Sequence, residues 1–320
     1  MKISVILCTY NRCQGLAKAL TSAAALTLPP PDEWEVLVVD NNSNDRTREV
    51  VESFCQRYPG CFRYIFEPKQ GKSHALNAGL RNARGEILAF TDDDVILEPA
   101  WLQNLTASLR GNEWAGAGGR VLAQRTFALP PWLSVEESFT RGPLALFDLG
   151  PQPEDLSEAP IGSNMAFRKF VFEKYGDFRT DLGPRPGSEI RNEDSEFGSR
   201  LMKAGERLRY EPSAVVYHEI PERRLRKKYF LAWWYDKARG EIRSIGKSSG
   251  SKWCVKGIPL LQVRRMVVWT LRWLLALDPV KRFSCRIQVW VVTGRIHESY
   301  RQASATGRTI VETTTRGRQA

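Results

Sequence analysis

The chain has 320 residues, of which 42% are hydrophobic and 26% are charged, and its formal net charge is +11. These proportions fit a soluble globular protein with a sizeable core, and they exclude a disordered chain, a collagen-like fibre and a small disulfide-rich scaffold. Six cysteines without a CxxC pair argue against structural zinc and suit a reduced, cytosolic protein. No run of about 18 uncharged apolar residues is present, so we expect no ordinary membrane-spanning helix.

The charge is unevenly distributed along the chain. Residues 222–320 carry 22 Lys and Arg against 6 Asp and Glu, a net charge of +16, whereas residues 1–221 have a net charge of −5. Six of the ten Trp residues also lie in that last part. We therefore expect a near-neutral body, a boundary near Pro221, and a basic C-terminal part that suits an anionic partner, either membrane lipid or nucleic acid.

The first 110 residues alternate between strand and helix patterns. Short apolar runs rich in β-branched residues predict buried strands, and Ala- and Leu-rich or capped segments predict helices. The expected order is strand 3–8, helix 15–28, strand 36–39, helix 45–57, strand 62–66, helix 73–82, strand 87–90 and helix 99–109. This alternation predicts a mainly parallel sheet with helices on both of its faces.

The later part of the chain is less regular. Residues 111–160 are rich in Gly and Pro, and we expect long loops there. Further elements are expected as strand 164–167, helix 169–175, helix 193–204, strand 214–217, a basic helix 263–277 and a second apolar patch at 287–292. The basic, Trp-bearing helix suits the headgroup zone of an anionic membrane, and it equally suits a helical region that packs on the body.

Polar residues follow the predicted strands of the body. Ligands on parallel α/β sheets bind beyond the carboxyl ends of the strands. Thr9 and Asn11 follow the first strand, Asp40 follows the second, and the acidic run 92–94 follows the fourth. No Gly-x-Gly-x-x-Gly motif follows the first strand, and Gly71-Lys72-Ser73 lacks the upstream glycine of a P-loop. Dinucleotide binding and P-loop hydrolysis are therefore disfavoured.

The run Asp92-Asp93-Asp94 is the strongest chemical signal. Adjacent carboxylates repel one another unless a cation or hydrogen bonds compensate, and a hard divalent ion prefers such oxygen ligands. Taken alone, the run is more simply a solvated acidic turn. The polar residues at the other strand ends favour the cation instead. His218 can complete a metal shell beside one carboxylate, although a lone histidine at a strand end is usually structural.

Three further residues have both a chemical and a structural interpretation. Asp40 can accept a hydrogen bond from a base or a ribose, or it can cap a turn. Lys72 can lie over a diphosphate, or it can simply be solvated. Asp194, at the start of a predicted helix, can act as a general base, although acidic residues at a helix start are also favoured by the helix dipole.

Five segments carry polar motifs in a fixed order: Cys8-Thr9-Tyr10-Asn11-Arg12, Val39-Asp40-Asn41-Asn42-Ser43, the segment 71–79, Thr91-Asp92-Asp93-Asp94 and Asn192-Glu193-Asp194. Their order and spacing resemble those of family-2 glycosyltransferases with the GT-A fold, and the resemblance covers residues 1–220. It implies a GT-A (Rossmann-like) α/β fold whose mixed, mainly parallel sheet is flanked by helices. We therefore expect a GT-A domain at 1–221, a basic, Trp-rich helical extension at 222–307 and a disordered tail at 308–320.

The resemblance also implies roles for individual residues. The nucleotide-sugar would contact Thr9, Tyr10, Asn11, Arg12, Asp40, Lys72, Asp92 and Asp93. Asp94 and His218 would hold Mn2+ or Mg2+ on the diphosphate, and Asp194 would be the catalytic base. Gly162, Ser163, Asn164 and Glu193 would contact the acceptor. Many members carry Ala-Arg-Asn where this chain has Ala75-Leu76-Asn77, and Lys72 is expected to supply the missing charge.

The implied activity is inverting transfer of a sugar from a nucleotide-sugar, expected to be UDP-linked, to a hydroxyl of a lipid-linked or polysaccharide acceptor. With its basic part, the protein is expected to be cytoplasmic and peripheral on the inner face of the cell membrane.

Two alternatives are a nucleic-acid-binding protein and a sugar nucleotidyltransferase. The first lacks zinc-finger spacing and any RNP-like motif, so no nucleic acid is expected as a partner. The second usually has a Gly-rich loop after the first strand, and residues 9–14 contain no glycine.

Overall fold

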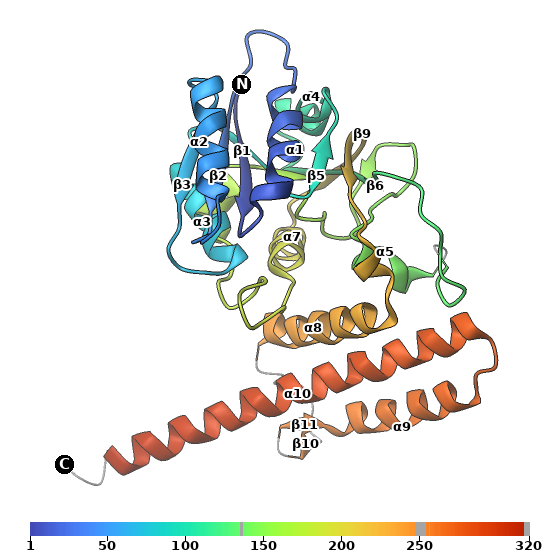
Figure 1. The fold of residues 1–320 in the computed structure, drawn as a ribbon. Helices are drawn as coiled ribbons and strands as arrows, with labels where there is room; N and C mark the ends of the chain where they lie inside the picture. The colour runs from blue at the N-terminus through green and yellow to red at the C-terminus, as the bar shows by residue number, and fades with distance from the viewer. Residues whose placement is uncertain (135–136, 247–253, 256, 317–320) are drawn as a thin grey trace. The chain divides into compact units, whose positions relative to one another are not determined.

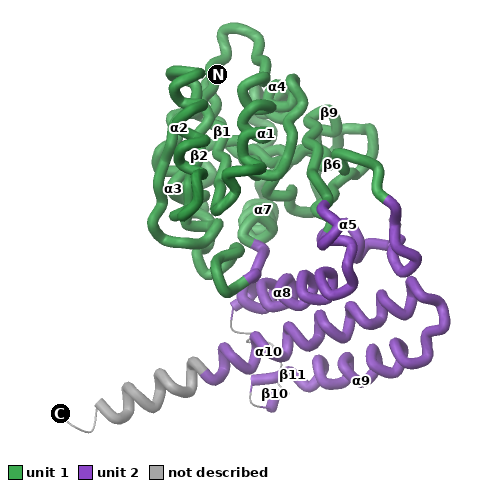
Figure 2. Tube along the Cα trace, in the orientation of Figure 1, with its two compact units in different colours: residues 1–127, 144–188, 193–220 green, residues 128–143, 189–192, 221–320 purple. Residues whose placement is uncertain are grey.

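The computed structural model describes residues 1–320 apart from 135–136, 247–253, 256 and 317–320, and for residues 305–316 it describes the backbone (Figure 1). The chain forms two compact units (Figure 2). Unit 1 comprises residues 1–127, 144–188 and 193–220, and unit 2 comprises 128–143, 189–192 and 221–320. The last change of unit along the chain falls at residue 221, and two earlier segments also belong to unit 2, so the division into 1–221, 222–307 and 308–320 stays a prediction.

Unit 1 is built on a nine-stranded mixed sheet with strand order β3-β2-β1-β4-β8-β6-β9-β5, and β7 pairs with β9. The strands are β1 (Lys2–Thr9), β2 (Glu33–Asp40), β3 (Phe62–Phe66), β4 (Ile87–Asp92), β5 (Val95–Leu97), β6 (Gly116–Ala123), β7 (Glu154–Asp155), β8 (Met165–Arg168) and β9 (Leu208–His218). Strands β1 to β4 are mutually parallel, whereas β8 runs antiparallel to both β4 and β6. The predicted mixed, mainly parallel sheet is confirmed.

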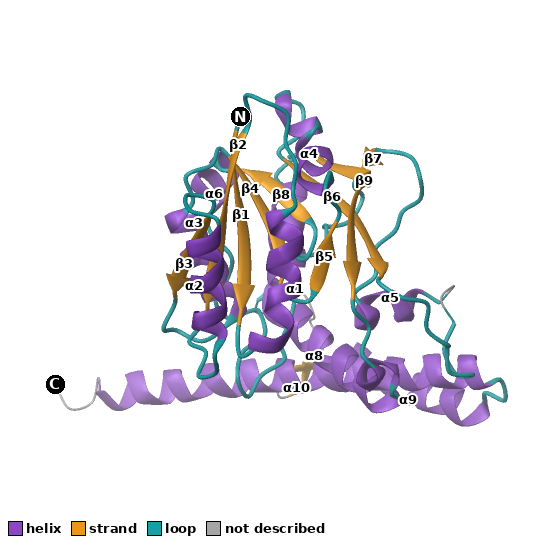
Figure 3. Cartoon of the chain, turned by 45° about the horizontal axis from the view of Figure 1, so that its top comes forward, coloured by secondary structure: helices purple, strands orange, loops and turns teal. Residues whose placement is uncertain are grey.

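Helices flank this sheet (Figure 3). In unit 1 they are α1 (Cys13–Ala24), α2 (Thr47–Arg57), α3 (Lys72–Asn82), α4 (Trp101–Thr106), the 3-10 turn η1 (Ser108–Arg110), α6 (Phe170–Tyr175) and α7 (Glu193–Lys203). α1 packs against α2, and α3 packs on β1 and β2. The central strands are almost continuously apolar because helices cover them, as the buried run Val5-Ile6-Leu7 of β1 illustrates.

Strand β6 lies where the Gly and Pro content predicted a loop, and β9 is longer than the predicted strand. The sequence of β6 is Gly-Ala-Gly-Gly-Arg-Val-Leu-Ala. Its glycines allow neighbouring side chains and backbone to lie close to the strand. A Cβ at Gly116 would lie 2.3 Å from the Phe167 ring, and one at Gly119 would lie 2.2 Å from the carbonyl oxygen of Ala214. The expectation of a long loop here is therefore wrong for residues 116–123, because these glycines serve packing and not turns.

Unit 2 is mainly helical. Its elements include α5 (Ser138–Leu144, whose last residue belongs to unit 1), η2 (Glu222–Leu225), α8 (Lys227–Ile245), α9 (Leu260–Leu275), α10 (Pro279–Arg316) and the short paired strands β10 (Cys254–Val255) and β11 (Ile258–Pro259). α10 packs against both α8 and α9. It continues to Arg316, past residue 308 where we expected a disordered tail to begin, and no proline interrupts the chain after Pro279.

The core of unit 2 is an aromatic cluster. The Trp132 and Phe283 rings lie with their centroids 4.5 Å apart, Trp132 lies 5.3 Å from Phe230, and Phe139 lies 6.2 Å from Phe283.

In the described part of the chain, none of the helices combines the length and the apolar character needed to cross a bilayer.

Candidate active site

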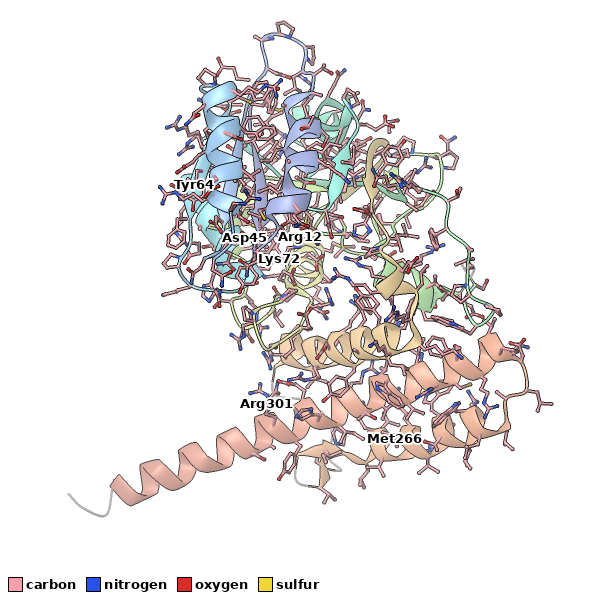
Figure 4. The ribbon with its side chains drawn as sticks, viewed as in Figure 1. Arg12, Asp45, Tyr64, Lys72, Met266 and Arg301 are labelled. Atoms are coloured by element: carbon pink, nitrogen blue, oxygen red, sulfur yellow. The ribbon has the colours of Figure 1, made fainter. Side chains whose placement is uncertain are left out.

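The carboxyl ends of three neighbouring strands bring the predicted polar residues together. In the sheet register, Thr9 of β1 is opposite Asp40 of β2, and Cys8 is opposite Asp92 of β4. Val95 of β5 is opposite His218 at the end of β9. Arg12 and Lys72, both labelled in Figure 4, lie at this same end of unit 1.

The acidic run at the end of β4 is partly neutralised by two cationic side chains. Arg12 donates from Nη2 to Asp94 Oδ2 at 2.9 Å, and its Nε lies 3.4 Å from Asp93 Oδ1. Thr9 Oγ1 donates to Asp93 Oδ2 at 2.7 Å. Burial raises the pKa of Asp93 to about 7, with Arg12 opposing this rise and Asp94 adding to it. Three carboxylates thus face two cations, Arg12 and Lys72, and a further cation beside them would favour the ionised form of Asp93.

Lys72 links the acidic run to a second element. Its Nζ donates to Asp92 Oδ1 at 2.7 Å and lies 3.8 Å from Glu193 Oε1, at the start of α7. Burial alone would lower the pKa of Lys72, but the charges of Asp92 and Glu193 outweigh it and raise the pKa. Lys72 therefore stays charged, and it joins residues about 100 positions apart in the sequence into one cluster.

The loop that presents Lys72 is held by Asn41, which sequence reasoning did not assign to the site. Asn41 is buried, its Oδ1 accepts the N–H of Gly71 at 2.7 Å, and its Nδ2 donates to the carbonyl of Lys69 at 2.8 Å. Its place directly after Asp40, at a strand end, was the available signal. An amide at that position can bond both a donor and an acceptor of a neighbouring loop.

Asp40 is held in place by Tyr64, the second residue that sequence reasoning missed. The carboxylate is 2% exposed, and it accepts the Ser43 N–H at 3.0 Å and the Tyr64 hydroxyl at 2.9 Å. Burial, together with Asp40, raises the pKa of Tyr64, so the phenol remains a donor. Tyr64 lies within β3, where nothing in the sequence distinguishes it from a structural strand residue.

The loop after β1 is tied to the loop after β2. Asn11 adopts a φ of 50°, its backbone N–H donates to Ser43 Oγ, and its Oδ1 accepts the Asn44 N–H. Its neighbour Tyr10 is exposed. These bonds fix the two loops side by side, so the residues predicted to contact the nucleotide-sugar lie together at the strand ends.

Asp94 and His218 form the pair expected to hold a metal ion. His218 Nε2 lies 3.5 Å from Asp94 Oδ2, the imidazole is 2% exposed, and within the described residues its buried Nδ1 has no hydrogen-bond partner. No group of three or more His, Cys, Asp and Glu side chains suited to a metal occurs in the part of the chain that the structure describes. One carboxylate and one imidazole fit a divalent ion that takes its other ligands from a diphosphate and water.

Asp194, in the first turn of α7, lies beside the predicted acceptor residues. Its Oδ2 accepts the Gly162 N–H at 2.9 Å, and its Oδ1 accepts the Ser195 N–H at 2.7 Å. A Cβ at position 162 would lie 3.1 Å from Oδ2, so Gly162 permits this approach. The hydroxyl of Ser163 is buried without a partner among the described residues. Glu193 instead faces Lys72, on the side of the acidic run.

Asn164 does not fit the acceptor role expected of it. Its side chain is fully buried, its Oδ1 accepts the Trp101 Nε1–H at 2.8 Å, and its Nδ2 donates to the carbonyls of Arg120 and Ala214. The oxygen and both N–H groups of the amide are therefore engaged inside the protein. Asn164 connects α4, β6 and β9, and its role is structural.

The mixed, mainly parallel sheet of unit 1, with its flanking helices, is that of the GT-A fold. A similar fold occurs in the mannosyltransferase PcManGT from Pyrobaculum calidifontis, solved in complex with GDP-Man and Mn2+, with a TM-score of 0.56 and 20% identity over 99% of this chain and 80% of that one. Residues 4–176 match the model of glycosyl transferase family 2, so the chain belongs to this family.

Two curated relatives span most of the chain. Glycosyltransferase AglE of Haloferax volcanii is 28% identical over 272 residues, covering 84% of this chain and 80% of its own length. The succinoglycan biosynthesis protein ExoM of Rhizobium meliloti is 28% identical over 234 residues, covering 73% of this chain and 70% of its own length. The similarity to glycosyltransferase AglE thus extends well beyond the segment matched by the family model.

Proposed function

We propose that this glycosyltransferase moves a sugar from a nucleotide-sugar to an acceptor hydroxyl with inversion, and that Asp194 is the catalytic base. The observation that carries the proposal is the bridge from Asp92 through Lys72 to Glu193, with distances of 2.7 and 3.8 Å. It joins the acidic strand end, suited to a donor diphosphate and a metal, to the helix turn that carries Asp194.

The donor half of the site follows from charge. Arg12 and Lys72 pair with carboxylates of the acidic run. Both side chains are cationic, so each can contact the oxygens of a donor diphosphate. Asp94 and His218 would hold Mn2+ or Mg2+, which when bound would stabilise the negative charge that develops on the departing diphosphate. Thr9, Tyr10, Asn11, Asp40, Asp92 and Asp93 would contact the nucleoside and the sugar.

The acceptor half follows from the hydrogen bonds of Asp194. Two backbone N–H groups, those of Gly162 and Ser195, orient its carboxylate. It can remove the proton of an acceptor hydroxyl as that oxygen attacks the anomeric carbon from the face opposite the diphosphate. Attack from that face inverts the anomeric centre, and no covalent sugar–enzyme intermediate is required.

The substrates are proposed by class. We propose a UDP-sugar as donor, although the solved neighbour PcManGT was crystallised with GDP-Man. The name of ExoM refers to succinoglycan biosynthesis, which supports a polysaccharide or lipid-linked acceptor here. A panel of UDP-, GDP- and dTDP-sugars with Mn2+, read by thermal shift and by slow donor hydrolysis, identifies the nucleotide without any acceptor.

Asp194→Asn tests the base directly. We expect transfer to fall by at least about 1000-fold, in the range found for loss of a general base, while donor binding in a thermal-shift titration is retained. Glu196→Gln is the matched control, because Glu196 lies on the same helix but pairs with Arg200 at 2.9 Å. Full transfer activity in Asp194→Asn would assign the base to another residue.

A further inference from the structure

Helix α9 carries an extended apolar face that no described residue of the chain covers. Its residues include no fully buried side chain. The exposed large apolar residues of this region are Leu260, Leu261, Val263, Val267, Val268, Leu271, Leu274, Leu275 and Leu277. They make up most of the exposed large apolar residues of the described chain, so this surface differs from the rest.

The opposite face of α9 packs on α10, which fixes the direction of the exposed face. Met266, labelled on α9 in Figure 4, and Trp273 are only partly exposed. Arg286 of α10 lies over the Trp273 ring at 5.3 Å and over the Trp290 ring at 5.2 Å. At about 100° per residue, Val267 and Leu271 then lie on the side of α9 away from Met266 and Trp273.

Basic residues lie within and beside the apolar face. Arg264, Arg265 and Arg272 are exposed, and the next helix begins with exposed Lys281 and Arg282. No Asp or Glu occurs between residues 260 and 277. An apolar face with Arg within and beside it is the pattern of a helix that lies in the headgroup region of an anionic bilayer. α9 has 16 residues, about 24 Å in length, so it is too short to span the bilayer core of about 30 Å.

We propose that α9 docks the protein on an anionic lipid bilayer, with Val267, Leu271 and Leu274 inserted among the acyl chains and the arginines at the lipid phosphates. A second copy of the chain fits this face less well, because a symmetric pair would bring Arg264 and its neighbours together without acidic partners. This inference concerns unit 2 alone and stands or falls independently of the proposed donor and base.

Vesicle co-sedimentation of the full chain tests the inference. We expect binding to phosphatidylcholine vesicles that contain about 30% phosphatidylglycerol, and much weaker binding to pure phosphatidylcholine. The double variant Val267→Asp, Leu271→Asp should lose binding by at least about tenfold, because both side chains are exposed and their burial in lipid would be lost. Arg264→Gln, Arg265→Gln should remove the preference for the anionic vesicles.

The controls separate insertion from general effects. Ile245→Asp changes an exposed apolar residue of unit 2 outside α9 and should bind like the unaltered chain. Circular dichroism and donor-induced thermal shift should be unchanged in every variant. Binding that survives the double Asp variant, or failure of the unaltered chain to bind anionic vesicles, would overturn the proposal. So would a lipid-free dimer that the double Asp variant abolishes, because a second copy would then cover the face.

Discussion

Arg12 pairs with the same oxygen of Asp94 that faces His218, and Asp94 and His218 are the two residues proposed to hold the metal. Its Nη2 lies 2.9 Å from Asp94 Oδ2, and His218 Nε2 lies 3.5 Å from the same oxygen. A guanidinium and a divalent ion compete for such an oxygen. In the absence of donor, we therefore expect Arg12→Gln to bind Mn2+ more tightly by about tenfold, equivalent to about 1.4 kcal/mol. Calorimetric Mn2+ titration measures this change.

The same substitution should strengthen Mn2+ binding but weaken binding of the donor. With Arg12 proposed at the diphosphate, Arg12→Gln should weaken nucleotide-sugar binding even where Mn2+ saturates. Arg207→Gln is a suitable control, since Arg207 is exposed and pairs with Glu113 and Asp155, neither of which is a proposed donor contact. Weaker Mn2+ binding by Arg12→Gln without donor would show that Arg12 supports the metal and does not compete with it.

Sequence reasoning could find the polar and charged residues at the strand ends, but not the residues that hold them in place. Thr9 and Asp92 were predicted because the carboxyl ends of parallel strands meet at one sheet edge, and the register places these ends together. Tyr64 could not be predicted, because its role depends on the pairing of β3 with β2, which carries its hydroxyl to Asp40. Asn164 was assigned to the acceptor from its motif, whereas burial gives it a structural role.

At the scale of elements, strand β6 depends on glycines that have no room for a side chain. A Cβ at Gly119 would lie 2.2 Å from the Ala214 carbonyl oxygen and 2.5 Å from Asn164 Nδ2. We expect Gly119→Ala to destabilise the protein by about 3 kcal/mol, the upper range for overpacking. Gly111→Ala is the control, because a Cβ at position 111 would have nothing within 4 Å of it, and this variant should be neutral. Urea unfolding measures both, and equal stabilities would remove the packing argument for β6.

Strand β6 also shows why part of the fold escaped prediction. Strands β1, β2 and β4 were predicted because each contains a short apolar run that is buried on both faces. In β6 the same burial is achieved with glycines, because the Phe167 ring and the Ala214 backbone occupy the space beside the strand. Composition alone cannot separate glycines that allow close packing from glycines that form turns.

Helices α8 and α10 are tied together by one buried carboxylate. Glu298 of α10 is fully buried, and it accepts from Arg243 of α8 at 3.0 Å and from Arg301 at 3.0 Å (Arg301 is labelled in Figure 4). Burial would raise the pKa of Glu298, but the arginines lower it to about 2. Glu298→Gln leaves these arginines without their anion, and we expect it to destabilise the protein by about 3 kcal/mol at neutral pH.

The pH dependence of this effect has a definite sign. The folded pKa of about 2 lies below the ordinary value of 4.5, so the unfolded chain binds the proton more readily. The contribution of Glu298 is complete above pH 4.5 and declines as the pH falls towards 2, so the Tm difference between the unaltered chain and Glu298→Gln should shrink in that window. Glu241→Gln, which affects a partly exposed pair between the same helices, should cost no more than about 1 kcal/mol. A Tm difference that stays constant from neutral pH to pH 2 would contradict the assignment.

At the scale of the whole molecule, the chain does not divide at a single point. Composition predicted a boundary near Pro221, where the net charge changes sign. Segments 128–143 and 189–192 nevertheless belong to unit 2. Trp132 and Phe139 therefore find their aromatic partners in residues that follow position 221. The distribution of charge shows where the composition of the chain changes, but it does not show which earlier segments pack with the later helices.

This arrangement predicts the behaviour of a chain ended at residue 221. Such a chain lacks Phe230 and Phe283, so Trp132, Leu133 and Phe139 would lose the core in which they are buried or half-buried. We expect it to bind the dye ANS and to aggregate, because several large apolar side chains become exposed together. A chain ended at residue 304 keeps these aromatic contacts and the Glu298 cluster, and it should behave like the full chain. If the shorter chain stayed monomeric and bound no dye, segment 128–143 would be stable without the later helices, and the aromatic cluster would not be what holds it.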